Sequence, residues 1–137
     1  MSEAEDMSWI LGHCKTIAVV GLSPKPHRES HGVSQAMQSH GYRIIPVNPN
    51  ASTILGEKVY RSLTEAAQHE KIDLVNVFRN SEDVPPVVDE AIAIGAPAVW
   101  LQLGIVHDAA IHQAQAVGLR AVQNRCIMVE HRRWSSR

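Results

Sequence analysis

A glycine and a group of basic residues stand together near the start of the chain. Gly21 follows an apolar run, and Lys25, His27 and Arg28 lie in the polar, proline-containing segment after it. Ser30 is typical of the N-cap of a helix. A glycine lets the backbone approach a ligand closely, and the amino end of a helix attracts anions. The combination indicates a site for a phosphate-bearing ligand; taken alone, the loop is equally consistent with a solvated basic turn.

A further cation, Arg79, ends another apolar run, at residues 73–78. Polar residues also follow the other apolar runs, at 48–50, 102–104 and 123–126. The carboxyl ends of parallel strands meet at one edge of a sheet, which is where α/β proteins bind ligands. An arginine at this edge, opposite the first loop, favours the interpretation of an anion site.

The loop after the first apolar run lacks two known nucleotide motifs. It reads GLSPKPHRESHG, which contains no GxGxxG, and the chain has no GxxxxGK[ST]. The place where NAD sites carry an acid holds Asn48, and no acid comes before Glu57. These features argue against an NAD site and a P-loop. They leave an NADP site open, because such a site can use a basic residue instead.

Short apolar runs alternate with helical patterns along the 137 residues. We predict strands at 16–20, 43–47, 59–60, 73–78, 98–101 and 119–122. Predicted helices cover 3–13, 30–40, 62–68, 84–94 and 107–117. This alternation predicts an α/β fold with a Rossmann-like, doubly wound parallel sheet and helices on both faces. With the strands numbered in chain order, we expect the spatial order 3-2-1-4-5-6, because the short third strand suits an edge.

Length, composition and charge exclude several classes of protein. We expect one domain over residues 1–137, with an N-terminal helix at 1–13 and a C-terminal tail at 127–137. The formal net charge is −1 and 4% of the residues are aromatic, which argues against a nucleic-acid partner. No apolar run is long enough to span a membrane, and the acidic N-terminus differs from a signal peptide. We therefore expect a soluble, cytoplasmic protein without membrane association.

The chain resembles a known family in seven stretches: AVVGLSPKP at 18–26, SHGV at 30–33, IPVNPN at 45–50, ILGEKVYRSL at 54–63, DLVNVFR at 73–79, WLQLGI at 100–105 and NRC at 124–126. In their order and spacing they are similar to the small stand-alone CoA-binding proteins. That family shares the CoA-binding Rossmann domain of the succinyl-CoA ligase alpha subunit. The resemblance spans roughly Thr16 to His131.

The resemblance implies coenzyme A, or an acyl-CoA, as the ligand. The cofactor-binding residues that it implies are Gly21, Ser23, Pro24, Lys25, Arg28, Ser30, Gly32, Asn48, Pro49, Phe78 and Arg79. The resemblance implies that Gly21, Ser23 and Pro24 face the pyrophosphate and the start of the pantetheine, and that Ser30 and Gly32 lie near the phosphates. It implies that Asn48 and Pro49 flank the adenosine. Phe78 and Arg79 would form the opposite wall of the site. Family members often have Lys where this chain has Asn50. The difference removes a candidate phosphate partner, and we expect either a lower affinity or a shift of phosphate binding to Lys25 or Arg28.

The two cysteines, Cys14 and Cys126, lie far apart and outside any metal-ligand spacing, so we expect neither a disulfide nor a metal site. Cys126 follows Arg125, a cation that can activate a thiol. A mixed disulfide with the CoA thiol is one hypothesis for Cys126, and a buried structural cysteine is the other. We interpret the basic segment around Arg132 as a frayed, solvated end.

Two classes of function remain. The first is a non-catalytic module that binds CoA, and leaves open a protein partner or a weak homo-oligomer. Two observations favour the binding module. The chain has the length of one domain, and the resemblance covers the binding half of the ligase relatives without their catalytic half. The alternative is an enzyme, either an NADP-dependent reductase or a CoA-ligase-like subunit that needs a catalytic partner.

Overall fold

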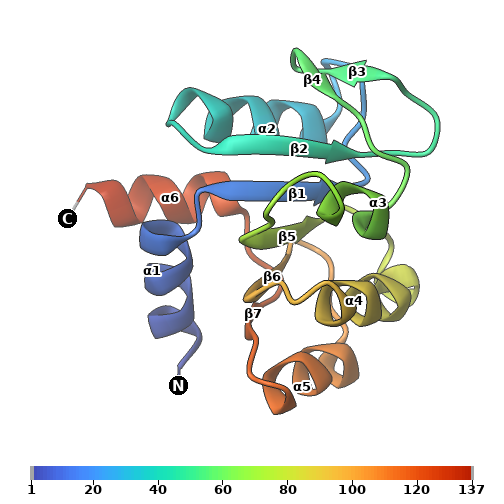
Figure 1. Cartoon of the computed structure of the whole chain (residues 1–137). Coiled ribbons are helices and arrows are strands. Elements are labelled where there is room, and N and C mark those ends of the chain that lie inside the picture. Colours follow the sequence, from blue (N-terminus) through green and yellow to red (C-terminus); the bar gives the residue numbers. More distant parts are fainter. Residues whose placement is uncertain (1, 137) are drawn as a thin grey trace.

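A parallel sheet lies between two layers of helices in the computed structural model, which describes residues 2–136 (Figure 1). Its strands are β1 (Thr16–Val20), β2 (Arg43–Val47), β5 (Leu74–Val77), β6 (Ala98–Leu101) and β7 (Arg120–Val122). They lie in the order β2-β1-β5-β6-β7, and every pair is parallel. Nearly all their residues are buried, as expected of a sheet covered on both faces.

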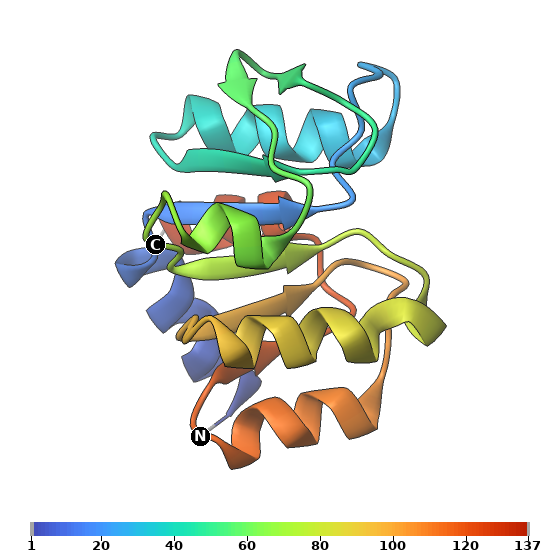
Figure 2. The same cartoon turned by 45° about the vertical axis from the view of Figure 1, so that its right-hand side comes forward.

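Three helices cover each face of the sheet (Figure 2). One layer contains α1 (Glu3–His13), α2 (Glu29–Ser39) and α6 (Ile127–Ser135). The other contains α3 (Leu63–Ala67), α4 (Val84–Ala93) and α5 (Asp108–Ala116). The predicted Rossmann-like fold class is therefore confirmed. Within residues 2–136, no helix is both long and apolar enough to cross a membrane.

The predicted third strand is wrong in detail. Residues 59–60 do not form a strand, and Tyr60 makes a single parallel bridge to Val47 at the end of β2. The pairing stops there because Ser62 caps α3 two residues later. A hairpin of β3 (Thr53–Ile54) and β4 (Glu57–Lys58) lies apart from the main sheet. The other five strands follow the predicted order.

The two ends of the chain pack against the sheet. The predicted N-terminal helix is confirmed as α1, and its buried Asp6 pairs with Arg120 of β7 at 3.1 Å. The predicted C-terminal tail is wrong, because residues 127–135 form α6. Ile127 and His131 are four residues apart, lie on one face of this helix, and are both buried. Met1 and Arg137 lie outside the described residues.

Candidate functional site

The first turn after β1 requires a glycine. Gly21 has a φ of +87°, and a Cβ added there would collide with the carbonyl oxygen of Phe78. The Gly21 N–H donates to Val47 O at 3.0 Å, and the Phe78 N–H donates to Val20 O at 2.9 Å. The end of β1 is thus held between β2 and β5, so that only a residue without a side chain fits at this place.

The start of α2 differs from the prediction. The N-cap is Arg28, and Ser30 lies inside the first turn. Ser30 is buried, and its Oγ accepts a hydrogen bond from Ser23 N at 3.0 Å. Ser23 Oγ in turn accepts from Lys25 N at 3.1 Å. Ser30 therefore fastens the glycine loop onto the first turn of α2, because its hydroxyl bonds to the loop instead of capping the helix.

Two adjoining cavities lie at the carboxyl edge of the sheet. The smaller, of about 400 Å³, is lined by Gly21, Ser23, Lys25, Arg28, Glu29, Ser30 and Phe78. The larger, of about 820 Å³, is lined by Arg28, Glu29, Phe78, Arg79, Asn80, Ser81, Glu82, Asp83, Gln102, Leu103, Gly104 and Ile105. Three residues line both cavities, namely Arg28, Glu29 and Phe78. Because of this shared wall, a single extended ligand can occupy both.

Most of the implied binding residues meet in this cleft. Those that line it are Gly21, Ser23, Lys25, Arg28, Ser30, Phe78 and Arg79. Pro24, Gly32, Asn48 and Pro49 line neither cavity. Asn48 Nδ2 donates to Leu22 O at 2.9 Å, and its Oδ1 accepts from Asn50 N at 2.8 Å. Asn48 thus braces the first loop against the end of β2.

The cleft carries unpaired positive charge. None of the ion pairs within residues 2–136 involves Lys25, Arg28 or Arg79. All three side chains belong to exposed residues. Guanidinium and ammonium groups with no acidic partner are free to bind phosphate oxygens.

Some lining residues were not predicted from the sequence. The larger cavity also contains the acids Glu29, Glu82 and Asp83. One wall is formed by the segment after β6, which contains Gln102 and Gly104. The segment after β6 could have been found from the sequence, because ligands of α/β proteins bind at the carboxyl ends of strands. The acids could not, because acids near the start of a helix are ordinarily explained by their interaction with the helix dipole. The larger cavity thus has three acids and two arginines in its lining, whereas the smaller one has the two cations Lys25 and Arg28 and the single acid Glu29.

Both cysteines lie away from this cleft. Cys126 is 8% exposed, precedes α6 as its N-cap, and lines neither cavity. Cys14 is also buried, and desolvation raises the pKa of its thiol to about 12. These positions give no support to a mixed disulfide with a ligand bound in the cleft.

The fold and the cleft define an α/β domain of the Rossmann-like class with a cleft, lined by both cations and acids, at the carboxyl edge of its sheet. Residues 15–132 match the model of a family described as CoA binding domain. This match covers most of the chain, which therefore belongs to that family.

Two relatives are similar over nearly their whole length, and a third is similar over a part of its own chain. The protein YneT of Bacillus subtilis is 47% identical over 122 residues, which cover 89% of both chains. A protein of Pyrococcus horikoshii is 38% identical, with a TM-score of 0.90 over 98% of this chain and 93% of its own. An acetyl-coenzyme A synthetase of Ca. Korarchaeum cryptofilum is 22% identical, with a TM-score of 0.74 over 85% of this chain and 27% of its own. The last comparison shows the fold alone.

Proposed function

We propose that the protein binds coenzyme A, or an acyl-CoA, at the carboxyl edge of its sheet and acts as a binding module without catalysis of its own. The observation that carries this proposal is the cleft, in which the Gly21 loop and two unpaired cations, Lys25 and Arg28, meet at the start of α2, while a third, Arg79, lines the adjoining cavity. Membership of the CoA binding domain family supports this choice of ligand.

In this proposal the phosphates lie in the smaller cavity. Gly21 lines this cavity and makes the tight turn after β1, and the amino end of α2 adds its free N–H groups and positive dipole end. Lys25 and Arg28 supply charge on the open side of the cavity. The adenosine lies toward Asn48 and Pro49, beyond the smaller cavity. Because position 50 is an asparagine and not a lysine, binding of the phosphates depends on the cations of the first loop.

The pantetheine arm then continues past Phe78 into the larger cavity, where Arg79 lines the wall. The shared wall of the two cavities supports this course, because an extended ligand needs a continuous path. The larger cavity has room for the thiol end and a short acyl group. Its polar and charged lining favours a short or polar acyl group over a long hydrocarbon chain.

Calorimetric titration of arginine variants with CoA tests this proposal. Arg28→Ala should weaken binding by about tenfold or more, which corresponds to the loss of a hydrogen bond to a charged phosphate. Arg79→Ala, in the cavity of the uncharged arm, should weaken binding by about three- to tenfold, the equivalent of an ordinary hydrogen bond. Arg132→Ala, on the exposed side of α6, is the matched control and should leave the affinity unchanged. If both cleft variants bind CoA as well as the control does, the proposed site is wrong.

A further inference from the structure

One wall of the larger cavity is a loop with few apolar anchors. It runs from residue 102 to residue 107, between β6 and α5, and it contributes Gln102, Leu103, Gly104 and Ile105 to the lining. Leu103 is 61% exposed and Val106 is 41% exposed. The Val106 N–H is held from outside the loop, by Ser81 Oγ at 3.0 Å. The course of this loop therefore depends on polar contacts with other segments.

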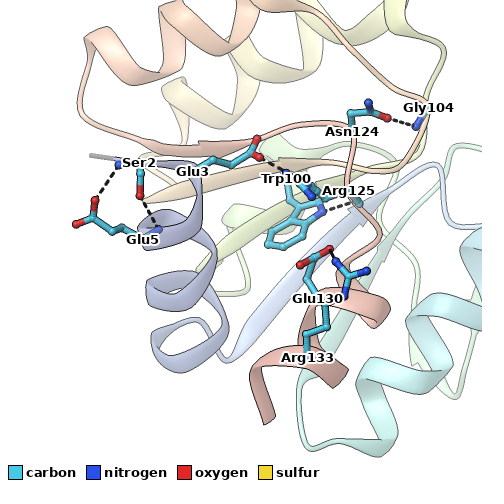
Figure 3. A network of polar contacts seen from close by, with 9 residues as sticks. All are labelled: Ser2, Glu3, Glu5, Trp100, Gly104, Asn124, Arg125, Glu130 and Arg133. Carbon is cyan, nitrogen blue, oxygen red and sulfur yellow. Dashed lines mark hydrogen bonds and ion pairs between the residues drawn. The ribbon is translucent and has the colours of Figure 1, made fainter. Parts of the chain in front are cut away.

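The segment that follows β7 provides two of these contacts. Asn124 Oδ1 accepts a hydrogen bond from Gly104 N at 2.8 Å, as Figure 3 shows. Gln123 Oε1 accepts from His107 N at 2.9 Å. Consecutive side chains of one segment thus hold the backbone of the loop at two points, three residues apart. The position of this cavity wall is set from the segment after β7.

Asn124 combines two properties that this position needs. Its φ of +59° lies in the left-handed region, which within residues 2–136 only one other non-glycine residue, Leu55, adopts. Asparagine tolerates this conformation because of its short polar side chain. A glycine would adopt the backbone conformation more easily but would have no oxygen for the Gly104 N–H. The side chain at 124 therefore serves the loop, at a modest conformational cost.

The same segment is fixed on its other side, away from the cavity. The Trp100 indole Nε1–H donates to Arg125 O at 2.8 Å. Arg125 Nε pairs with Glu3 Oε1 of α1 at 3.1 Å (Figure 3). With the backbone of Arg125 anchored to the buried Trp100 of β6, Asn124 has a firm base from which to place Gly104.

We infer that Asn124 is a positioning residue for the far end of the ligand, the pantetheine arm with its thiol or acyl group. This inference rests on the proposed function. Asn124 acts through Gly104, whose loop lines the larger cavity and is absent from the lining of the smaller one. It therefore affects binding of the arm and leaves binding of the phosphates unchanged. A residue with a merely structural role would affect both parts of the ligand equally.

Two ligands separate these possibilities: CoA, and adenosine 3′,5′-bisphosphate, which keeps the nucleoside and two of the three phosphates of CoA but lacks the distal phosphate and the arm. Asn124→Gly keeps the backbone conformation and removes the acceptor. This variant should weaken the binding of CoA about three- to tenfold, the equivalent of one hydrogen bond, and leave the affinity for the truncated ligand unchanged. Asn124→Asp keeps an acceptor oxygen and should restore CoA binding. Glu3→Gln, which alters the same segment away from the cavity, is the control and should change neither affinity.

The outcomes are distinct. Equal weakening of both ligands by Asn124→Gly, or no weakening of either, would overturn the role of Asn124 while leaving the proposed function intact. If the unaltered chain binds no CoA, the proposed function fails and this inference fails with it. A measurement on the unaltered chain covers the case in which the glycine variant does not fold. The amide resonance of Gly104 should shift with CoA but not with adenosine bisphosphate, and an equal response to both ligands would overturn the inference.

Discussion

Replacing Gly21 with alanine tests how the first turn is built. The new Cβ would meet the carbonyl oxygen of Phe78, which belongs to backbone and cannot rotate away as a side chain could. The hydrogen bonds from Gly21 N to Val47 O and from Phe78 N to Val20 O hold both sides of the contact in place. Relief therefore requires the ends of β1 and β5 to separate, at the entrance of the smaller cavity.

The cost has two parts. The positive φ of Gly21 costs about 1–2 kcal/mol once a side chain is present. Forcing an extra methyl group into a packed place costs about 1–3 kcal/mol more. The total is about 2–5 kcal/mol, against a total stability of about 5–15 kcal/mol for an ordinary domain. At about 4 °C per kcal/mol for a chain of this size, the melting temperature should fall by about 8–20 °C.

Gly95→Ala is the matched control in a thermal unfolding assay. Gly95 also has a positive φ, of +75°, but a Cβ added there meets no atom within 4 Å. The Gly95→Ala variant should lose only the conformational part of the stability, about 1–2 kcal/mol, which lowers the melting temperature by about 4–8 °C. Equal losses for the two variants would refute the reasoning about Phe78. Gly21→Ala should also lose CoA binding, whereas Gly95→Ala should keep it.

Other variants test the packing around the sheet. Burial, together with the nearby His40, lowers the pKa of His131 below 6.5. The unfolded chain therefore takes up the proton first, and stability falls as the pH drops below about 6.5. His131→Phe should reduce the slope of the unfolding free energy against pH in this range, measured by urea unfolding at several pH values. An unchanged slope would contradict this explanation. Since burial raises the pKa of Cys14 to about 12, a thiol reagent at neutral pH should label it only after unfolding; rapid labelling of the native protein would show that it is accessible. Asp6→Asn weakens the pair with Arg120 and should cost about 1–3 kcal/mol by chemical denaturation, and no measurable loss would mean that the pair does not hold α1 to the sheet.

The strands could be predicted from the sequence because a sheet buried on both faces produces continuous apolar runs. The hairpin of β3 and β4 was missed, since strands of two residues leave no periodic signal. The helix α6 was missed because one of its two buried residues is a histidine. His131 stacks on His40, with ring centroids 4.4 Å apart, and packs edge-on against Tyr42. A histidine buried by aromatic contacts looks like a polar surface residue in the sequence.

The part of the candidate site that lies directly at the strand ends could be predicted from the sequence. Gly21 and Arg79 end strands at the carboxyl edge, and the structure brings them to the same cleft. The rule identifies the edge but not the direction of each side chain. Asn48 also ends a strand, yet its amide bonds to Leu22 O and it lines neither cavity. The contact of Asn124 with Gly104 joins residues that are twenty apart in sequence, and no local pattern indicates it.

The most direct test of the central claim is calorimetric titration of the unaltered chain with CoA, and separately with NADP, at two salt concentrations. We predict micromolar binding of CoA that weakens at the higher salt, because the cations of the first loop bind the phosphates. We predict no binding of NADP. Binding of NADP but not of CoA would contradict the proposed function. CoA binding that is insensitive to salt would contradict the role given to Lys25 and Arg28.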